Sequence, residues 1–321
     1  MESRLTTKTA NRAAGPSLAS RMWSYKALYL MLVPGLAFMF LFSYGPIYGL
    51  IIAFKNYSLT QGILGSPWAG RGGFEHFAVF FTDPYALAAL RNTIILSLSR
   101  QLVEFPAPII LAILVNEIGC EPYKKTVQSI TYIPHFISWI ILGSMLAAIL
   151  APETGIVNVM LKAVTGRTIY FMADNNWFRP FLIMTGMLKN VGWSSIVYLA
   201  AISNVNPQLY EAAVVDGANR IQRIRYITVP MLMPLASIIL ILSMGGILSG
   251  GFDQVFNTYN PMVYATADII DTYTYRMGIV GQKYSFAAAV GLFKSSAGFI
   301  MVIIVNTLTK RLNGSSDTGL M

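Results

Sequence analysis

Residues 206–230 read NPQLYEAAVVDGANRIQRIRYITVP, a polar segment between two long apolar stretches. Asn206 is a favourable helix N-cap and Pro207 a favourable first helical residue. Helix-forming residues follow, and an Asp-Gly pair ending at Gly217 is a turn signal that interrupts the helix. The sequence therefore predicts a short helix over 207–215.

A second short helix is expected over 218–226, carrying Arg220, Arg223 and Arg225, with Pro230 ending it. Each piece has about nine residues, whereas crossing the hydrocarbon core of a bilayer takes about 20. We therefore expect two short helices that lie in or below the membrane interface and connect two membrane spans.

The composition of the 321-residue chain supports a membrane protein. Hydrophobic residues make up 55% and charged residues 12%, against about 25% charged residues in soluble domains. The single cysteine, Cys120, excludes an internal disulfide framework and a cysteine-cluster metal site. The two histidines, His76 and His135, are too far apart in sequence for a His-x-x-x-His zinc pair.

Six apolar segments are long enough to cross a bilayer, and they predict an all-α polytopic protein with a six-helix transmembrane domain over 27–309. They are Ala27–Phe54, Asn92–Asn116, Val127–Ala151, Pro180–Ser203, Val229–Phe252 and Tyr284–Thr309.

The connections between these spans predict the orientation. One set, made of 1–26, 117–126, 204–228 and 310–321, holds 12 Lys and Arg in 73 residues. The other set, 55–91, 152–179 and 253–283, holds 8 in 96 residues. The positive-inside rule then places both termini in the cytoplasm, as an N-terminal segment 1–26 and a tail 310–321. We expect the first span to be an uncleaved helix and not a removed signal.

Several kinds of chemistry leave no trace in the sequence. There is no Gly-x-x-x-x-Gly-Lys-Ser/Thr phosphate loop, no His-Glu-x-x-His and no Gly-x-Ser-x-Gly. No basic and aromatic patch accompanies the net charge of +9, so nucleic acid is not an expected partner. We predict a protein that is not an enzyme and has no catalytic, cofactor-binding or metal-ligating residues.

The helix expected over 207–215 carries small side chains, Ala212 and Ala213, beside the acidic Glu211. Small side chains permit close approach of another protein, and a single carboxylate can pair with a partner's arginine. The alternative is an amphipathic helix resting on lipid head groups. The arginines of 218–226 suit that alternative, whereas Glu211 suits it poorly because anionic lipid repels acids.

Charged residues inside a span normally face protein or a wet cavity. Lys189 and Trp193 lie one helical turn apart, as do Asn190 and Ser194. This polar and aromatic stripe could stack and hydrogen-bond a sugar ring in a substrate path, and Lys189 would favour an acidic sugar. Alternatively, Lys189 bonds a neighbouring carbonyl or pairs with a partner subunit, and both possibilities stay open.

Other polar residues in or near the spans have structural explanations. Arg100 and Glu104 are four residues apart on one helical face and are expected to neutralise each other. Lys294 is expected to extend outward along its helix. His135, after a proline, is expected to be a hydrogen-bonded kink residue. Asp253, Gln254 and Asn257 follow the fifth span at its outer end, where they are expected to meet substrate or a partner protein, or to be exposed to solvent.

The spacing of Glu211-Ala-Ala, Asp216-Gly217-Ala218 and Ile227-Thr-Val-Pro230 resembles the cytoplasmic EAA loop of permease subunits of binding-protein-dependent ABC importers. Further stretches resemble the oligosaccharide branch of that family, including permeases of bacterial alginate importers. They are Tyr44–Lys55, Gly62–Trp68, Arg91–Thr93, Phe105–Ala112 and Thr131–Trp139.

The resemblance implies a type I ABC importer fold in the bacterial inner membrane and an acidic, alginate-like oligosaccharide as substrate. Implied partners are a second homologous permease, a periplasmic binding protein, membrane lipid, and two ATPase subunits that hold ATP and magnesium; this chain itself would hold no cofactor. The residues implied to couple to the ATPase within the loop 207–226 are Glu211, Ala212, Ala213, Asp216, Gly217 and Ala218, with Asp216 bracing the turn at Gly217.

An ion-coupled secondary transporter is the alternative, using Lys189 or the Arg100–Glu104 pair. It would need no EAA loop, and transporters of that class usually contain inverted repeats, of which the sequence shows none.

Overall fold

The computed structural model describes residues 23–312, which fall into two units divided between Ile51 and Ile52. The first unit contains α2 (Lys26–Met39) and η1 (Phe40–Tyr44), and η2 (Gly45–Phe54) continues across the division. The second unit is helical throughout apart from turns, loops and one antiparallel bridge, Lys55 to Trp68, among the residues described. The predicted all-α class is confirmed.

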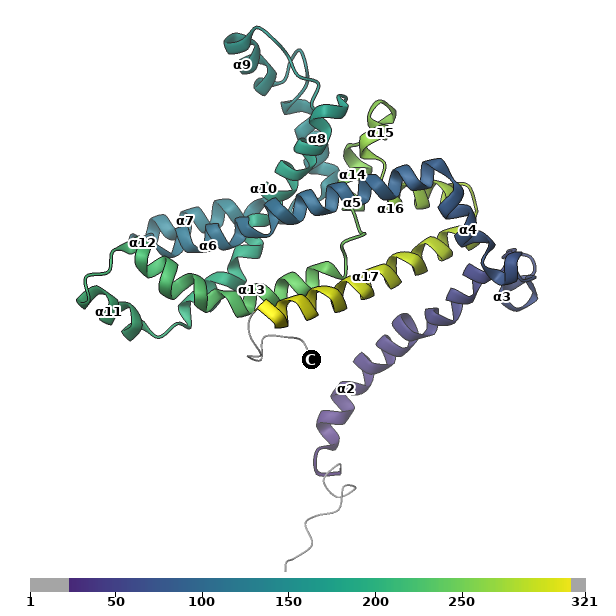
Figure 1. The fold of residues 1–321 in the computed structure, drawn as a ribbon, viewed down its shortest axis with the longest axis horizontal. Coiled ribbons are helices and arrows are strands. Elements are labelled where there is room, and N and C mark those ends of the chain that lie inside the picture. The colour runs from purple at the N-terminus through teal and green to yellow at the C-terminus, as the bar shows by residue number, and fades with distance from the viewer. Residues whose placement is uncertain (1–22, 313–321) are drawn as a thin grey trace, which may run out of the picture. The chain divides into compact units, whose positions relative to one another are not determined.

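The helices of the second unit form a bundle with shorter elements at its ends (Figure 1). In chain order they are α3 (Gly62–Gly65), η3 (Arg71–Gly73), α4 (Glu75–Thr82), α5 (Pro84–Glu104), α6 (Pro106–Asn116), α7 (Glu121–Tyr132), η4 (Ile133–Phe136), α8 (Trp139–Ile149), α9 (Ile156–Thr165), α10 (Asn175–Ser203), α11 (Pro207–Val215), α12 (Arg220–Arg223), η5 (Ile224–Thr228), α13 (Val229–Met244), α14 (Phe252–Thr258), η6 (Pro261–Val263), α15 (Tyr264–Ala267), α16 (Ile270–Thr274), η7 (Tyr275–Val280) and α17 (Tyr284–Leu312).

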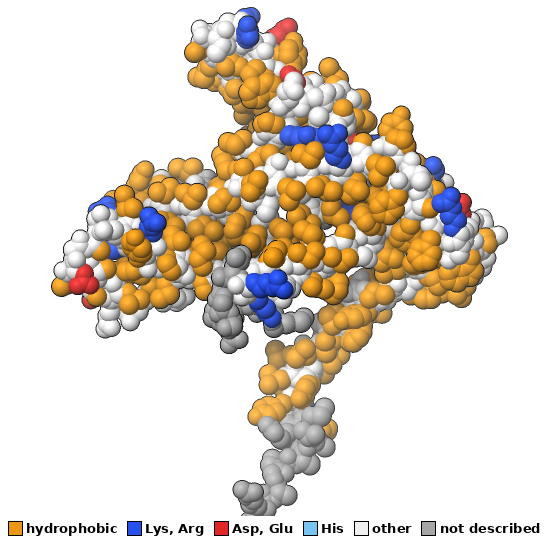
Figure 2. Space-filling view, in the orientation of Figure 1, with side chains coloured by type: hydrophobic (Ala, Val, Ile, Leu, Met, Phe, Trp, Pro, Cys, Tyr) orange, Lys and Arg blue, Asp and Glu red, His pale blue; other side chains and the backbone are white. Residues whose placement is uncertain are grey.

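Four helical runs in the described chain are long and apolar enough to cross a membrane: Lys26–Phe54, Pro84–Asn116, Arg220–Met244 and Tyr284–Arg311. A fifth candidate consists of two helices joined at a sharp bend. The 29-residue α10 has the length to cross, but its central polar residues lower its hydropathy. Apolar side chains cover most of the visible surface, and the few charged ones lie mainly near helix ends (Figure 2).

The expected third span, 127–151, is not one straight helix. Glu121–Phe136 and Trp139–Ile149 meet at an angle of 105°. Ile137 and Ser138 have extended backbone conformations, and the Ser138 hydroxyl accepts a hydrogen bond from the Ile141 N–H at the start of α8. We attribute the bend to Pro134, because a proline lacks the amide hydrogen that a continuing helix needs.

The second short helix also differs from the expectation. It does not end at Pro230, because α12, η5 and α13 run on as one 25-residue helix from Arg220 to Met244. The π-helical turn of η5 lies directly before Pro230 and changes the local hydrogen-bond register, which allows the proline to be accommodated. The span then ends at Met244, eight residues earlier than expected, where Gly245 and Gly246 begin a series of turns.

Helix α10 lies at the centre of the second unit and contacts α5, α6, α7, α13, α14 and α15. Buried apolar clusters lie along it. One contains Phe178, Phe181 and Leu182 with Leu96 and Val255, and another contains Tyr198 and Ile202 with residues of α6 and α13. Small residues allow the closest approach: a Cβ on Gly192 would overlap the backbone carbonyl of Thr131 in α7.

Substituting Gly192 by alanine should therefore destabilise the packing of α10 against α7. We expect Gly192→Ala to lower the thermal unfolding midpoint of the detergent-solubilised protein, measured by size-exclusion chromatography after heating. Gly291→Ala in α17 is the matched control, because a Cβ there meets nothing within 4 Å. Its midpoint should equal or exceed the original one, since alanine favours a helix by about 1 kcal/mol over glycine. Equal losses in both variants would contradict this account.

Candidate functional site: an exposed loop helix and a polar cavity

Helix α11 is bounded by local hydrogen bonds. The Asn206 side chain accepts a hydrogen bond from the Gln208 N–H at 3.0 Å. At the other end Gly217 adopts a φ of +80°, and the Ala218 N–H donates to the Ala213 carbonyl at 2.8 Å. This left-handed position favours glycine because it has no Cβ. The sequence thus encodes both ends of α11.

Helix α11 stands away from the helical body, at the end where α6, α7 and α12 also lie (Figure 1). Glu211 and Ala212 are exposed, and the apolar Val215 is 87% exposed. One side-chain bond ties α11 to the following helix, between the Tyr210 and Thr228 hydroxyls at 2.9 Å. An acidic, apolar and small-residue surface is therefore exposed on a helix whose two ends are fixed by local hydrogen bonds.

Lys189, at the midpoint of α10, is hydrogen-bonded to the backbone at the break between η4 and α8. Its ammonium group donates hydrogen bonds to the carbonyls of Pro134, His135 and Ile137, the second at 2.7 Å. Only 8% of Lys189 is exposed, and the ammonium lies 5.5 Å from the centre of the Trp139 ring. The sequence left open whether Lys189 contacts a sugar or bonds a neighbouring carbonyl. In this structure it bonds neighbouring carbonyls.

The other residues of the stripe surround the same break. The His135 ring stacks parallel to the Trp193 ring with 4.7 Å between centroids, and its Nδ1 lies 3.2 Å from the Asn190 Oδ1. His135 is therefore a hydrogen-bonded residue of the kink, as expected. Trp193 is still 45% exposed, so part of its surface stays available for another contact.

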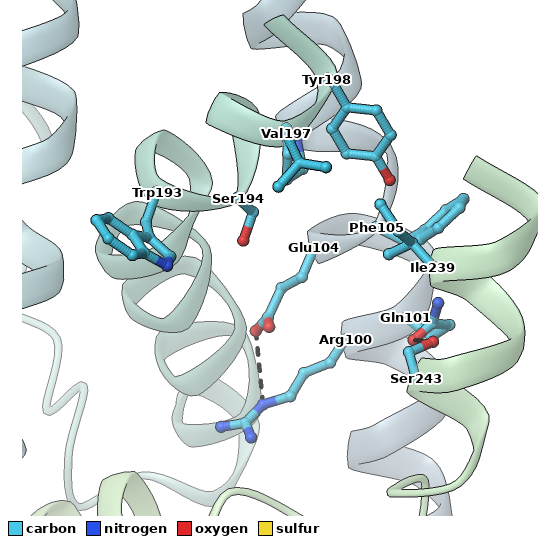
Figure 3. Close-up of a pocket in the computed structure, with 11 residues that line it drawn as sticks. Arg100, Gln101, Glu104, Phe105, Trp193, Ser194, Val197, Tyr198, Ile239 and Ser243 are labelled. Atoms are coloured by element: carbon cyan, nitrogen blue, oxygen red, sulfur yellow. Dashed lines mark hydrogen bonds and ion pairs between the residues drawn. The ribbon is translucent and has the colours of Figure 1, made fainter. Parts of the chain in front are cut away.

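A cavity of about 450 Å³ lies between α10, α5–α6 and α13 (Figure 3). Trp193 and Ser194 contribute from α10, and Arg100 and Glu104 from α5. Asn190 reaches a second cavity, of about 230 Å³, that also touches Arg100 and Glu104. Lys189 lines neither of these and borders an apolar cavity instead. The larger cavity is lined by Arg100, Gln101, Glu104, Phe105, Pro108, Trp193, Ser194, Val197, Tyr198, Ile239 and Ser243.

Arg100 connects α5 to the chain that follows the fifth span. Its Nε lies 3.6 Å from a Glu104 carboxylate oxygen, as the spacing of the two residues predicted. Its Nη1 donates to the Gly250 carbonyl at 2.9 Å, and its Nη2 donates to the Gln254 side-chain oxygen. Gln254 in turn donates to the Leu182 carbonyl of α10 at 2.8 Å. Gln254 is therefore buried, and not exposed at the outer end of a span.

Two glycines make room for this ion pair. A Cβ on Gly186 would lie 2.6 Å from a Glu104 oxygen, and a Cβ on Gly251 would overlap the Arg100 guanidinium. Sequence analysis missed Gly186 and Gly251, because only the folded arrangement brings them against α5.

Lys294 forms an ion pair with Asp271 of α16, so it does not simply extend outward along its helix. Close to Asp271 in the chain, Asp268 accepts two hydrogen bonds from Arg276, of 2.8 and 2.5 Å. The hydrogen bonds that Arg276 donates to Asp268 raise the pKa of Arg276 above its ordinary value. Burial, followed by the hydrogen bond to Asp83, raises the pKa of Tyr273. Within the described residues, no group of three or more His, Cys, Asp and Glu side chains is placed to hold a metal ion.

The chain resembles known transport proteins over most of its length. It is 42% identical to Protein LplB of Bacillus subtilis over 288 residues, covering 90% of each chain. It is 40% identical to the polygalacturonan/rhamnogalacturonan transport system permease protein YteP of Bacillus subtilis, covering 92% of this chain and 91% of that one.

Two crystal structures share its fold. A permease chain of a bacterial ABC transporter involved in the import of the acidic polysaccharide alginate matches with a TM-score of 0.84 and 39% identity, covering 92% of this chain and 99% of that chain. The bacterial alginate ABC transporter in complex with an alginate pentasaccharide-bound periplasmic protein gives 0.84 and 38%, covering 93% and 99%.

The family profile for the inner membrane component of binding-protein-dependent transport systems matches residues 105–317, about two thirds of the chain. This stretch contains α11, the break beside Lys189 and most of the residues that line the cavity beside Arg100. The chain belongs to the family of inner membrane components of binding-protein-dependent transport systems, as the EAA-like spacing indicated.

Proposed function

We propose that this chain is a permease subunit of an importer that carries an acidic oligosaccharide across the inner membrane, driven by ATP hydrolysis on partner subunits. The exposed α11 carries the proposal, because it would serve as the docking surface for an ATPase on a chain without a phosphate-binding loop of its own. The relatives support the substrate class. YteP is named for polygalacturonan and rhamnogalacturonan, and the solved transporter for alginate; these polysaccharides are rich in carboxylates.

The proposed assembly contains a second, homologous permease, two ATPase subunits that hold ATP and magnesium, and a periplasmic binding protein. The solved alginate transporter complexed with its periplasmic protein supports the last of these. The topology proposed is six spans with 1–26 and 310–321 in the cytoplasm, in which the bent α7–α8 pair is the third span and α10 the fourth. This places α11 on the cytoplasmic side, where ATP is available.

Coupling is proposed to run through Glu211, Ala212, Ala213, Asp216, Gly217 and Ala218. Movement of an ATPase groove that holds α11 would reach the membrane by two routes, the Tyr210–Thr228 bond and the turn at Gly217. Beyond that turn, α12 continues into α13 without interruption. Movement of this connected segment, α11 to α13, would switch the permease between inward-open and outward-open states. This is coupling between two sites through a two-state element.

The substrate path is proposed to include Trp193, Ser194 and Asn190. The exposed part of the Trp193 indole suits the apolar face of a sugar ring, and the hydroxyl and amide beside it suit sugar hydroxyls. Lys189 is assigned a supporting role here. It stabilises the bend, and the bend positions His135 so that its ring stacks on Trp193.

The substrate class can be tested on the reconstituted transporter with its binding protein. Uronate oligosaccharides should stimulate ATP hydrolysis, and neutral oligosaccharides of equal length should stimulate it much less. The measurement is phosphate release from proteoliposomes over a range of sugar concentrations. Equal stimulation by neutral sugars would overturn the acidic substrate, and failure of any ATPase to copurify with the chain would overturn the transporter class.

Glu211→Lys and Gly217→Pro should each abolish ATP-dependent uptake while the chain still inserts into the membrane. The first reverses the charge that pairs with the partner, and the second places proline, with its φ near −65°, at a φ of +80°. Uptake into vesicles, normalised to the inserted protein, is the measurement. Glu153→Lys is the matched control, since Glu153 is an exposed acid in the opposite set of loops. Normal uptake by both loop variants would count against coupling through α11.

A further inference from the structure

Three cations of the described chain lie ten or more residues from either end of a long helical run: Arg100, Lys189 and Lys294. Each has internal partners. Lys189 donates to three backbone carbonyls, Lys294 pairs with Asp271, and Arg100 is held by Glu104, Gly250 and Gln254. Arg100 and Lys294 are therefore paired with carboxylates, whereas Lys189 keeps its positive charge but is buried, with carbonyl acceptors around its ammonium group.

The pairing of Arg100 is visible at the wall of the cavity of about 450 Å³. In Figure 3, Arg100 and Glu104 project from α5 into the space faced by Trp193 and Ser194 of α10. The side chains of Arg100 and Glu104 are 14% and 27% exposed, so the acid is the more accessible member of the pair. The positive charge is thus compensated at the cavity wall itself.

What remains accessible around the cavity is neutral and mostly apolar. The side-chain nitrogen of Gln101 is buried. Trp193 supplies an aromatic surface, and Ser194 and Ser243 supply hydroxyl groups. These groups match the hydroxyls and ring faces of a sugar. They match its carboxylates poorly, because ionised groups out of water need a charged partner.

From this arrangement we infer that Glu104 is a specificity-determining residue that masks Arg100, so that this subunit recognises sugar hydroxyls and ring faces but not carboxylates. The inference rests on the proposed function and adds to it that discrimination by charge arises outside the spans of this chain. A masked arginine also favours turnover, because a conducting path must bind its cargo weakly enough to release it. A bare guanidinium in a partly dehydrated cavity would retain each uronate that reached it, since charges attract far more strongly there than in water.

The test uses the complete transporter in nanodiscs, without the binding protein, and two ligands of equal length: a uronate oligosaccharide and its carboxyl-reduced, neutral counterpart. The unsubstituted transporter should bind both with affinities within about threefold of each other, a difference well below 1 kcal/mol. Glu104→Gln removes the masking charge at nearly constant shape. It should raise the affinity for the uronate ligand alone by about tenfold or more, and slow its maximal import.

The double variant R100Q/E104Q separates this role from a purely structural one. Without either charge, the preference for the uronate should disappear again, and neutralising a buried pair is commonly tolerated. If the pair had a structural role alone, the substitutions would change the stability of the protein and the affinities for both ligands by the same factor. The ratio of the two affinities would then stay constant. Thermal unfolding midpoints of all variants are measured alongside to report that stability.

Two outcomes would overturn the inference. One is a tenfold or greater preference of the unsubstituted transporter for the uronate that Arg100→Gln or Lys189→Met abolishes, because a cation of this chain would then bind carboxylates. The other is no binding of either ligand while import proceeds, because the cavity would then contact no sugar. By contrast, a transporter that imports no uronate oligosaccharide even with its binding protein contradicts the proposed function itself.

Discussion

The structure depends most on the hydrogen bonds that Lys189 donates to the carbonyls of Pro134, His135 and Ile137. In hydrocarbon, no water replaces a lost helical hydrogen bond, so a broken helix at membrane depth needs another group to satisfy its backbone. Lys189 meets this need from the middle of α10. The cation and the bend therefore require each other: the lysine needs buried acceptors, and the bend needs a buried donor.

This constraint explains how the neighbouring features are positioned. With the bend fixed, His135 stacks on Trp193, and the small residues of α10 let the helix lie close to α7. One helical turn before Lys189, Gly186 leaves space for Glu104, which pairs with Arg100. The cavity beside Arg100 is bordered by Trp193 and by this ion pair. Its walls are mostly apolar, with a few hydroxyl groups and no excess charge, and that character suits the ring faces and hydroxyls of a sugar more than an isolated ion.

The sequence predicted local features well and through-space features poorly. The limits of α11, the turn at Gly217 and the Arg100–Glu104 pair follow from neighbours in the chain, so capping, glycine and helical-spacing rules could find them. The number of spans stays a prediction, since hydropathy alone identifies four runs and one bent pair. The partners of Lys189 and Lys294, and the burial of Gln254, depend on segments between 23 and 154 residues away, which no periodicity reveals.

We propose above all that a separate ATPase binds α11 from the cytoplasm. The most direct test is thiol crosslinking in a background where the exposed Cys120 is replaced by serine. Ala212→Cys on α11 should crosslink to a partner ATPase subunit in membranes, and an impermeant thiol reagent applied from outside should not reach it. Ala163→Cys, exposed on α9, should give the reverse pattern. Labelling of Ala212→Cys from outside, with no crosslink to an ATPase, would contradict the account.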